Sequence, residues 1–102
     1  MIHVLATIQL HPGRRAAFLV EFHQLVPLVR AEQGCLEYGP AVDVASGVPA
    51  QPAVRDDVVV VVEKWHDLPA LLAHLAAPHM QAYRGKVKDL VAAVELRILQ
   101  PA

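Results

Sequence analysis

The sequence predicts a small α+β domain whose elements follow the order βαββαβ, the split βαβ or ferredoxin-like arrangement, with an antiparallel sheet. Two observations lead to this fold. Four segments have the length and composition of strands. The segments that follow the first and the third of them carry apolar residues at helical spacing. The chain has 102 residues, so we expect residues 1–102 to form one domain.

The first half of the chain predicts a strand followed by a helix. Residues 2–10 are mostly aliphatic or β-branched, and a His-Pro-Gly turn ends them. From residue 14 to residue 32 apolar side chains recur every three or four residues, at Phe18, Phe22, Leu25, Val26 and Val29. Pro27 is expected to kink this helix because its ring removes a backbone donor. Gly34 follows at the place of a left-handed C-cap.

The middle of the chain predicts two strands joined by a long loop. Residues 35–44 are expected to form the second strand, and residues 43–57, which contain a Ser-Gly pair and two prolines, the loop. A loop of this length is uncommon in a compact domain unless it serves a function. Residues 58–65, with five consecutive valines, are the clearest strand of the sequence.

The last third predicts two helices and a final strand. Asp67 is placed to cap a helix that has a proline in its first turn and ends near Ala77. A second helix is expected from residue 79, just after Pro78, to about residue 92. Residues 94–99 are expected to form the last strand.

Both faces of the predicted sheet are apolar. In the third strand one face holds Val58, Val60 and Val62, and the other holds Val59, Val61 and Trp65. In the first strand one face holds Ile2, Val4, Ile8 and Leu10, and the other holds Leu5. Helices in this fold cover one face only, so a second face in water would alternate to polar residues. We therefore expect a homodimer in which two sheets pack face to face.

Composition and charge exclude several classes of function. The formal net charge is −1, with 9 Lys and Arg against 10 Asp and Glu and no basic patch, so nucleic acid is not an expected partner. The longest strongly apolar run, residues 58–62, is far shorter than the ~20 residues that span a bilayer. The first residues lack the pattern of a signal peptide, and Cys35 is the only cysteine. We expect a cytoplasmic, reduced setting.

Nine side chains that interrupt the apolar pattern are candidates for a small-molecule site between the sheet and the helices. They are Thr7, Gln9, Tyr38, Glu63, Trp65, His74, His79, Met80 and Tyr83. Each has an ordinary structural alternative. The Trp and Met residues are often core packing, the tyrosines half-buried structural residues, and the histidines surface or satisfied core residues. Thr, Gln and Glu are also ordinary polar members of strands. Only the convergence of these residues favours the functional interpretation.

Metal and nucleotide sites have little support in the sequence. Of the six histidines, the closest pair is His74 and His79, five residues apart with Pro78 between them. This spacing does not place both rings on one helical face, so we expect no metal. Cys35 has no local nucleophile signature and is expected to be a small apolar filler. No glycine-rich fingerprint indicates a flavin, nicotinamide or nucleoside triphosphate site.

Several motifs resemble those of antibiotic biosynthesis monooxygenase domains. They are Val4-Leu5-Ala6-Thr7-Ile8 with Pro12-Gly13, Glu32-Gln33-Gly34-Cys35, Glu63-Lys64-Trp65 and Ala73-His74-Leu75-Ala76-Ala77-Pro78-His79-Met80. The resemblance covers nearly the whole chain. Further segments are similar to the bacterial quinol monooxygenase branch, namely Tyr38-Gly39-Pro40-Ala41-Val42-Asp43, Gly47-Val48 and Arg97-Ile98-Leu99-Gln100-Pro101.

This resemblance implies a dimeric α/β barrel that oxygenates a quinol-like or polyphenolic aromatic with O₂ and without metal, flavin or haem. A deprotonated quinol is a good electron donor to O₂, so the protein has to deprotonate and position it in a dry pocket. His74 is the first choice for the base, because imidazole titrates near neutral pH, and His79 is the second. The other expected contacts to the aromatic ring and its oxygens come from Trp65, Tyr83, Tyr38 and Thr7.

Two alternatives remain open. Haem-degrading enzymes of the same superfamily carry an Asn on the first strand, a Trp on the helix after the third strand and a haem-ligating His ten residues later. The corresponding positions here hold Thr7, His74 and Arg84, which makes haem breakdown the less expected activity. The other alternative is a small-molecule binding or regulatory dimer without oxygenase activity, because a fold alone does not set function.

Overall fold

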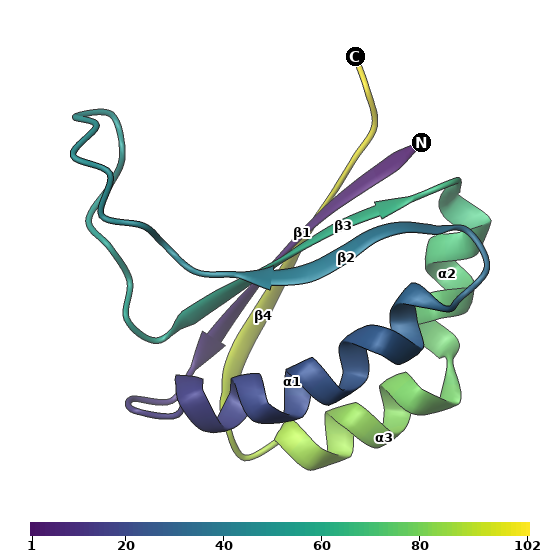
Figure 1. Cartoon of the computed structure of the whole chain (residues 1–102), viewed down its shortest axis with the longest axis horizontal. Helices are drawn as coiled ribbons and strands as arrows, with labels where there is room; N and C mark the ends of the chain where they lie inside the picture. The colour runs from purple at the N-terminus through teal and green to yellow at the C-terminus, as the bar shows by residue number, and fades with distance from the viewer.

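The computed structural model describes all 102 residues of the chain. Its elements are β1 (Ile2–Leu10), α1 (Arg15–Arg30), β2 (Cys35–Ala41), β3 (Val58–Trp65), α2 (Leu68–Ala76), α3 (Pro78–Val87) and β4 (Val91–Leu99). The strands form one antiparallel sheet in the order β2-β3-β1-β4, with the helices packed on one side of it (Figure 1). The predicted α+β, ferredoxin-like fold is confirmed. No helix is both long and apolar enough to cross a membrane.

The segment between β2 and β3 contains neither helix nor strand and projects from one end of the sheet (Figure 1). β2 ends at Ala41, not at residue 44 as the sequence predicted. The chain leaves the sheet here because the Asp43 carboxylate accepts hydrogen bonds from the backbone N–H and the guanidinium of Arg55. These bonds close the base of the loop, which covers residues 42–57.

The boundary between α3 and β4 also differs from the prediction. α3 ends at Val87 and not near residue 92, and β4 begins at Val91 and not at residue 94. The backbone of Val91 pairs with that of Leu10 in β1. Pairing within the sheet therefore overrides the local helical pattern in this segment.

α1 buries the predicted apolar stripe against the sheet and stays helical past Pro27 to Arg30. Its C-cap is Ala31, three residues earlier than the glycine that the sequence placed there. Gly34 does have the left-handed backbone that was expected, with φ of +83°, but it lies in the turn that leads into β2. α2 begins as predicted, because the Asp67 carboxylate accepts a hydrogen bond from the backbone N–H of Ala70.

The helices cover one face of the sheet over β1 and β3 and leave the other face open. In these two strands the side chains toward the helices are buried, and they are Val4, Ala6, Ile8 and Leu10 of β1 and Val59, Val61, Glu63 and Trp65 of β3. On the helix side of β4, Val94, Leu96 and Ile98 remain 57%, 42% and 48% exposed. The open face holds Leu5 opposite Val62 and Thr7 opposite Val60. This face is mixed and not uniformly apolar as the sequence predicted, because the strand register also places His3, Lys64, Glu95 and Arg97 on it. Leu5 is 39% exposed there.

Candidate active site

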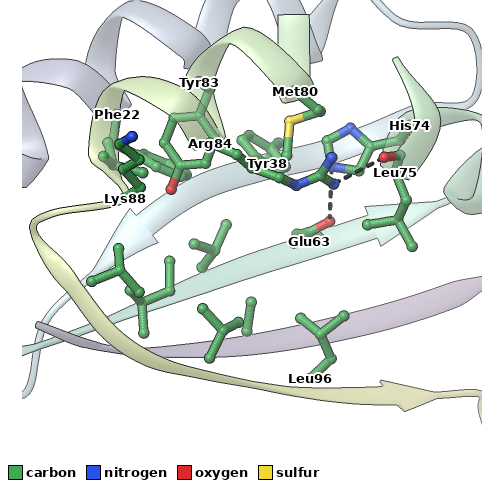
Figure 2. Close-up of a pocket in the computed structure, with 16 residues that line it drawn as sticks. Phe22, Tyr38, Glu63, His74, Leu75, Met80, Tyr83, Arg84, Lys88 and Leu96 are labelled. Carbon is green, nitrogen blue, oxygen red and sulfur yellow. Dashed lines mark hydrogen bonds and ion pairs between the residues drawn. The ribbon is translucent and has the colours of Figure 1, made fainter. Parts of the chain in front are cut away.

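A cavity of about 410 Å³ lies between the sheet and the helix layer, and 12 of the 16 residues that line it are hydrophobic. In Figure 2, Met80 and Tyr83 of α3 lie on one side of the cavity and Leu96 of β4 on the other. His74 and Glu63 lie close together at one end. An apolar cavity with a few polar groups is typical of a site for a small organic molecule.

His74 is only 1% exposed and is fixed from several sides. The centre of its ring lies 4.6 Å from that of Trp65 and 5.4 Å from that of Tyr38. Nδ1 lies 2.9 Å from Oε2 of Glu32, and Nε2 lies 3.9 Å from Oε1 of Glu63. The imidazole is therefore held through Nδ1, while Nε2 points toward the carboxyl group that lines the cavity.

Burial shifts the pKa values of Glu63 and His74 at this end of the cavity. It raises the pKa of Glu63 to about 7, although the hydrogen bond from Trp65 Nε1–H to Glu63 Oε1 (2.9 Å) opposes the rise. It also lowers the pKa of His74, while the hydrogen bond to Glu32 acts in the opposite direction. Near neutral pH the site therefore holds a neutral imidazole beside a carboxyl group that titrates in the physiological range.

Aromatic rings form much of the wall on the helix side. Tyr38 stacks on Phe22 with ring centres 5.6 Å apart, and Tyr83 meets the same ring edge-on at 5.8 Å. Burial raises the pKa of both tyrosines. Near neutral pH both hydroxyls are therefore protonated and able to donate a hydrogen bond.

The structure brings five of the nine candidate residues to the cavity, and they are Tyr38, Glu63, His74, Met80 and Tyr83. Trp65 is fully buried behind His74 and does not line the cavity. His79 does not line it either, and its Nε2 lies 2.7 Å from Oε2 of Glu32. Part of the His79 side chain borders a groove of about 90 Å³ between α1 and α3.

Thr7 and Gln9 do not line the cavity, contrary to the prediction. The register of β1 and β3 pairs Val4 with Glu63 and Thr7 with Val60, so Thr7 lies on the open face of the sheet. The side chain of Gln9 lies on that face too, and its Nε2 donates to the backbone oxygens of Leu10 and Asp57. Alternation along one strand is visible in the sequence, but the sequence does not say which faces of two strands coincide.

Two polar residues at the site were not among the candidates. Arg84 lines the cavity, and its Nη2 donates to the backbone oxygen of Leu75 at 2.9 Å (Figure 2). Glu32 contacts both His74 and His79. It is part of a motif that carries the family resemblance, but 42 residues separate it from His74, so no local pattern links the two.

The candidate site has no metal-binding arrangement: nowhere in the chain are three or more His, Cys, Asp or Glu side chains grouped to hold a metal ion. The cationic groups that line the cavity are Arg84 and Lys88. Lys88 lies at the end away from His74 (Figure 2).

A family model described as "Antibiotic biosynthesis monooxygenase" matches residues 1–86 of the chain. The chain belongs to the antibiotic biosynthesis monooxygenase family. An Escherichia coli (strain K12) protein named "Probable quinol monooxygenase YgiN" is 44% identical to it over 103 residues, which cover 99% of this chain and 98% of that protein.

Solved structures share the fold of the chain. The crystal structure of PA3566 from Pseudomonas aeruginosa has a TM-score of 0.80 at 27% identity, and the match covers 99% of this chain and 93% of that one. A conserved protein from Methanosarcina mazei Go1 has a TM-score of 0.84 at 20% identity over 99% and 92% of the two chains, which shows the common fold. In this member of the antibiotic biosynthesis monooxygenase family, the apolar cavity and its polar end form the candidate active site.

Proposed function

We propose that the protein oxidises a quinol-like or polyphenolic aromatic with O₂, without metal, flavin or haem. One observation carries the proposal: a buried imidazole, His74, points its Nε2 to the polar end of an apolar cavity. The similarity to YgiN, which is named a probable quinol monooxygenase, supports the substrate class.

The cavity suits a flat aromatic substrate. Its volume of about 410 Å³ is within the range of roughly 300–1,000 Å³ that is usual for small-molecule sites. In our proposal the ring packs against Met80 and Leu96, and the hydroxyl groups of Tyr38 and Tyr83 donate to its oxygens. Glu63, held by the indole N–H of Trp65, contacts the hydroxyl that faces His74.

The chemistry needs a base and a dry site. A quinol with a free ring carbon gives a hydroxyl proton to His74 Nε2 and one electron to O₂. The semiquinone and superoxide radicals combine, which forms a C–O bond at the free carbon. The proton returns from His74 and completes a ring hydroperoxide. The O–O bond then breaks as the same carbon loses its hydrogen, which yields a carbonyl and water. A proton shift gives the hydroxyquinone. One quinol and one O₂ thus give one hydroxyquinone and one water, and the quinol supplies all the electrons.

We also propose that the active protein is a cytoplasmic homodimer whose sheets pack face to face. The open face of the sheet carries Leu5, Val60, Val62 and Leu99, and no element of the chain covers them. An apolar patch on a soluble protein is commonly an interaction site. A second copy supplies the same apolar patch. A reducing compartment also suits Cys35, which is a free thiol.

Labelled oxygen tests the proposed reaction. With ¹⁸O₂ and a reduced menadione-type quinol, we expect one ¹⁸O atom in each hydroxyquinone and the other in water, measured by mass spectrometry. Spontaneous autoxidation gives unlabelled quinone and hydrogen peroxide, so a sample without protein is the control. Saturable binding of the quinol with no labelled product would contradict the proposal and favour the binding or regulatory dimer.

A further inference from the structure

We propose that Glu32 is the positioning residue of this site. Its carboxylate fixes His74 in the tautomer that leaves Nε2 free, and it stabilises the imidazolium that forms when His74 takes a proton. His79 holds Glu32 from the outer side of the helices and is itself not the base. This inference rests on the proposed function for the reaction, but the contacts exist without a substrate.

Both histidine contacts end on the same oxygen atom. Oε2 of Glu32 lies 2.9 Å from Nδ1 of His74 and 2.7 Å from Nε2 of His79. An ionised carboxylate only accepts hydrogen bonds, so each of these ring nitrogens carries a proton and donates it to Glu32. The neutral His74 ring then has its lone pair on Nε2, at the cavity end. A base that takes a proton from a bound substrate needs this tautomer.

Glu32 acts on the substrate only through His74. Its side chain is 15% exposed and does not line the cavity. A nearby carboxylate favours the charged form of an imidazole, which is the form that proton abstraction creates. Glu32 therefore stabilises a state reached during the reaction more than the resting state, which is the condition for a faster chemical step.

A tight turn against α2 brings Glu32 to this position. The backbone oxygen of Glu32 accepts a hydrogen bond from the N–H of Cys35. Between them Gly34 adopts φ of +83°, and a Cβ atom on it would lie only 2.7 Å from the Cβ of Ala70. Ala70 precedes His74 by one helical turn, so the two lie on the same face of α2. The close approach at Gly34 thus sets Glu32 beside His74.

His79 completes the arrangement from the outside. Its side chain is 27% exposed, beside the groove between α1 and α3. Nε2, the nitrogen that faces the interior, donates to Glu32 and has no lone pair to offer a substrate. The cavity-facing lone pair therefore belongs to His74, and the His79 contact keeps the shared carboxylate in place.

The pH dependence of the site follows from the groups around His74. Charged or titratable groups face it from every packed element, and they are Glu32 after α1, Tyr38 of β2, Glu63 of β3, and His79 and Arg84 of α3. Burial has the largest effect and lowers the pKa of His74. The hydrogen bond and the charge of Glu32 raise this pKa, and the charges of His79 and Arg84 lower it. Loss of the Glu32 charge therefore lowers the pKa of His74 further.

The first test needs no substrate. Proteins with ¹⁵N-labelled histidine are compared by NMR as a function of pH, using wild type, Glu32→Gln and the control Glu21→Gln, which removes a carboxylate from α1 without removing a histidine contact. The Gln oxygen still accepts the same N–H groups but has no charge. We expect His74 to be protonated at Nδ1 in all three proteins and its pKa to fall only in Glu32→Gln. A His74 protonated at Nε2 in the wild type, or an unchanged pKa in Glu32→Gln, would overturn the inference.

The second test uses turnover of the quinol. His74 has to be neutral to take a proton, so kcat/KM rises with pH through its pKa, and a lower pKa moves this acidic limb to lower pH. For Glu32→Gln we expect kcat to fall about tenfold or more, KM to stay within about twofold and the acidic limb to move down. A higher KM with unchanged kcat, or a limb that does not move, would assign Glu32 a binding or purely structural role.

The two failures are distinguishable. If the wild type forms no labelled hydroxyquinone, the proposed reaction is wrong, and the tautomer and pKa of His74 in the substrate-free protein still decide the role of Glu32. If the wild type turns over but Glu32→Gln behaves like Glu21→Gln in both tests, the reaction stands and the positioning role is wrong.

Discussion

At the residue scale, the candidate site depends on a few buried polar contacts between distant parts of the chain. His74 on α2 finds its partners in Glu32 after α1 and, at a longer distance, in Glu63 on β3. No buried side-chain nitrogen or oxygen lacks a hydrogen-bond partner. A buried polar group left without its partner costs about 1–3 kcal/mol. The contacts that orient the proposed base therefore also hold these elements together.

Glu63 makes the stability of the protein depend on pH. Burial raises its pKa from 4.5 to about 7 in the folded protein, so the folded state binds this proton more tightly than the unfolded chain does. The stability that this proton contributes is present below pH ~4.5 and is lost as the pH rises through about 7. We expect Glu63→Gln to gain up to about 3 kcal/mol relative to wild type between about pH 5 and pH 8, measured by urea unfolding. The exposed Glu95→Gln serves as the control, and a difference that does not change with pH would contradict the burial argument.

Part of the site is predictable from the sequence, because residue types that interrupt an apolar run are visible locally. His74, Glu63 and Tyr38 stood out in this way, and the structure gathers them at the cavity. Thr7 was misplaced because its face depends on the register between two strands. Glu32 was missed because its partner lies 42 residues away, and only the fold brings them together.

At the element scale, the turn between α1 and β2 controls where the site forms. Gly34 in this turn has a positive φ and lies against Ala70, whereas Gly13 has a similar φ of +79° and no atom within 4 Å of an added Cβ. The existence of each strand and helix followed from local spacing. Their ends did not, because the α3–β4 boundary depends on the pairing of Val91 with β1.

Paired glycine substitutions test this turn. Gly13→Ala is expected to lower the free energy of unfolding by about 1–2 kcal/mol, the cost of a left-handed backbone for a residue with a Cβ. Gly34→Ala is expected to cost about 1–3 kcal/mol more, because its Cβ also overlaps Ala70. It should also lower kcat, since the turn positions Glu32. Urea unfolding of both variants measures the difference, and equal destabilisation would show that the contact with Ala70 does not matter.

At the scale of the whole molecule, the open face of the sheet exposes apolar side chains that no other element of the chain covers. We expect sedimentation at micromolar concentration to give twice the chain mass of 11.1 kDa. Leu5→Lys places a charge on this face and should give monomers. Val20→Lys is the matched control, because Val20 is 60% exposed on α1 and lies away from the open face. A wild-type monomer, or an equal effect of the two substitutions, would contradict the sheet-to-sheet dimer.

In the proposed reaction, the side chains of this fold alone let a quinol react with O₂. Oxygen uptake by the purified protein, with a reduced menadione-type quinol and a chelator present, tests it most directly against a blank without protein. We expect uptake above the blank that survives the chelator and falls about 10²- to 10⁴-fold in His74→Ala, while the exposed His23→Ala keeps it. Uptake no faster than the blank would contradict the oxygenase. Uptake within about twofold of wild type in His74→Ala would contradict the assignment of the base.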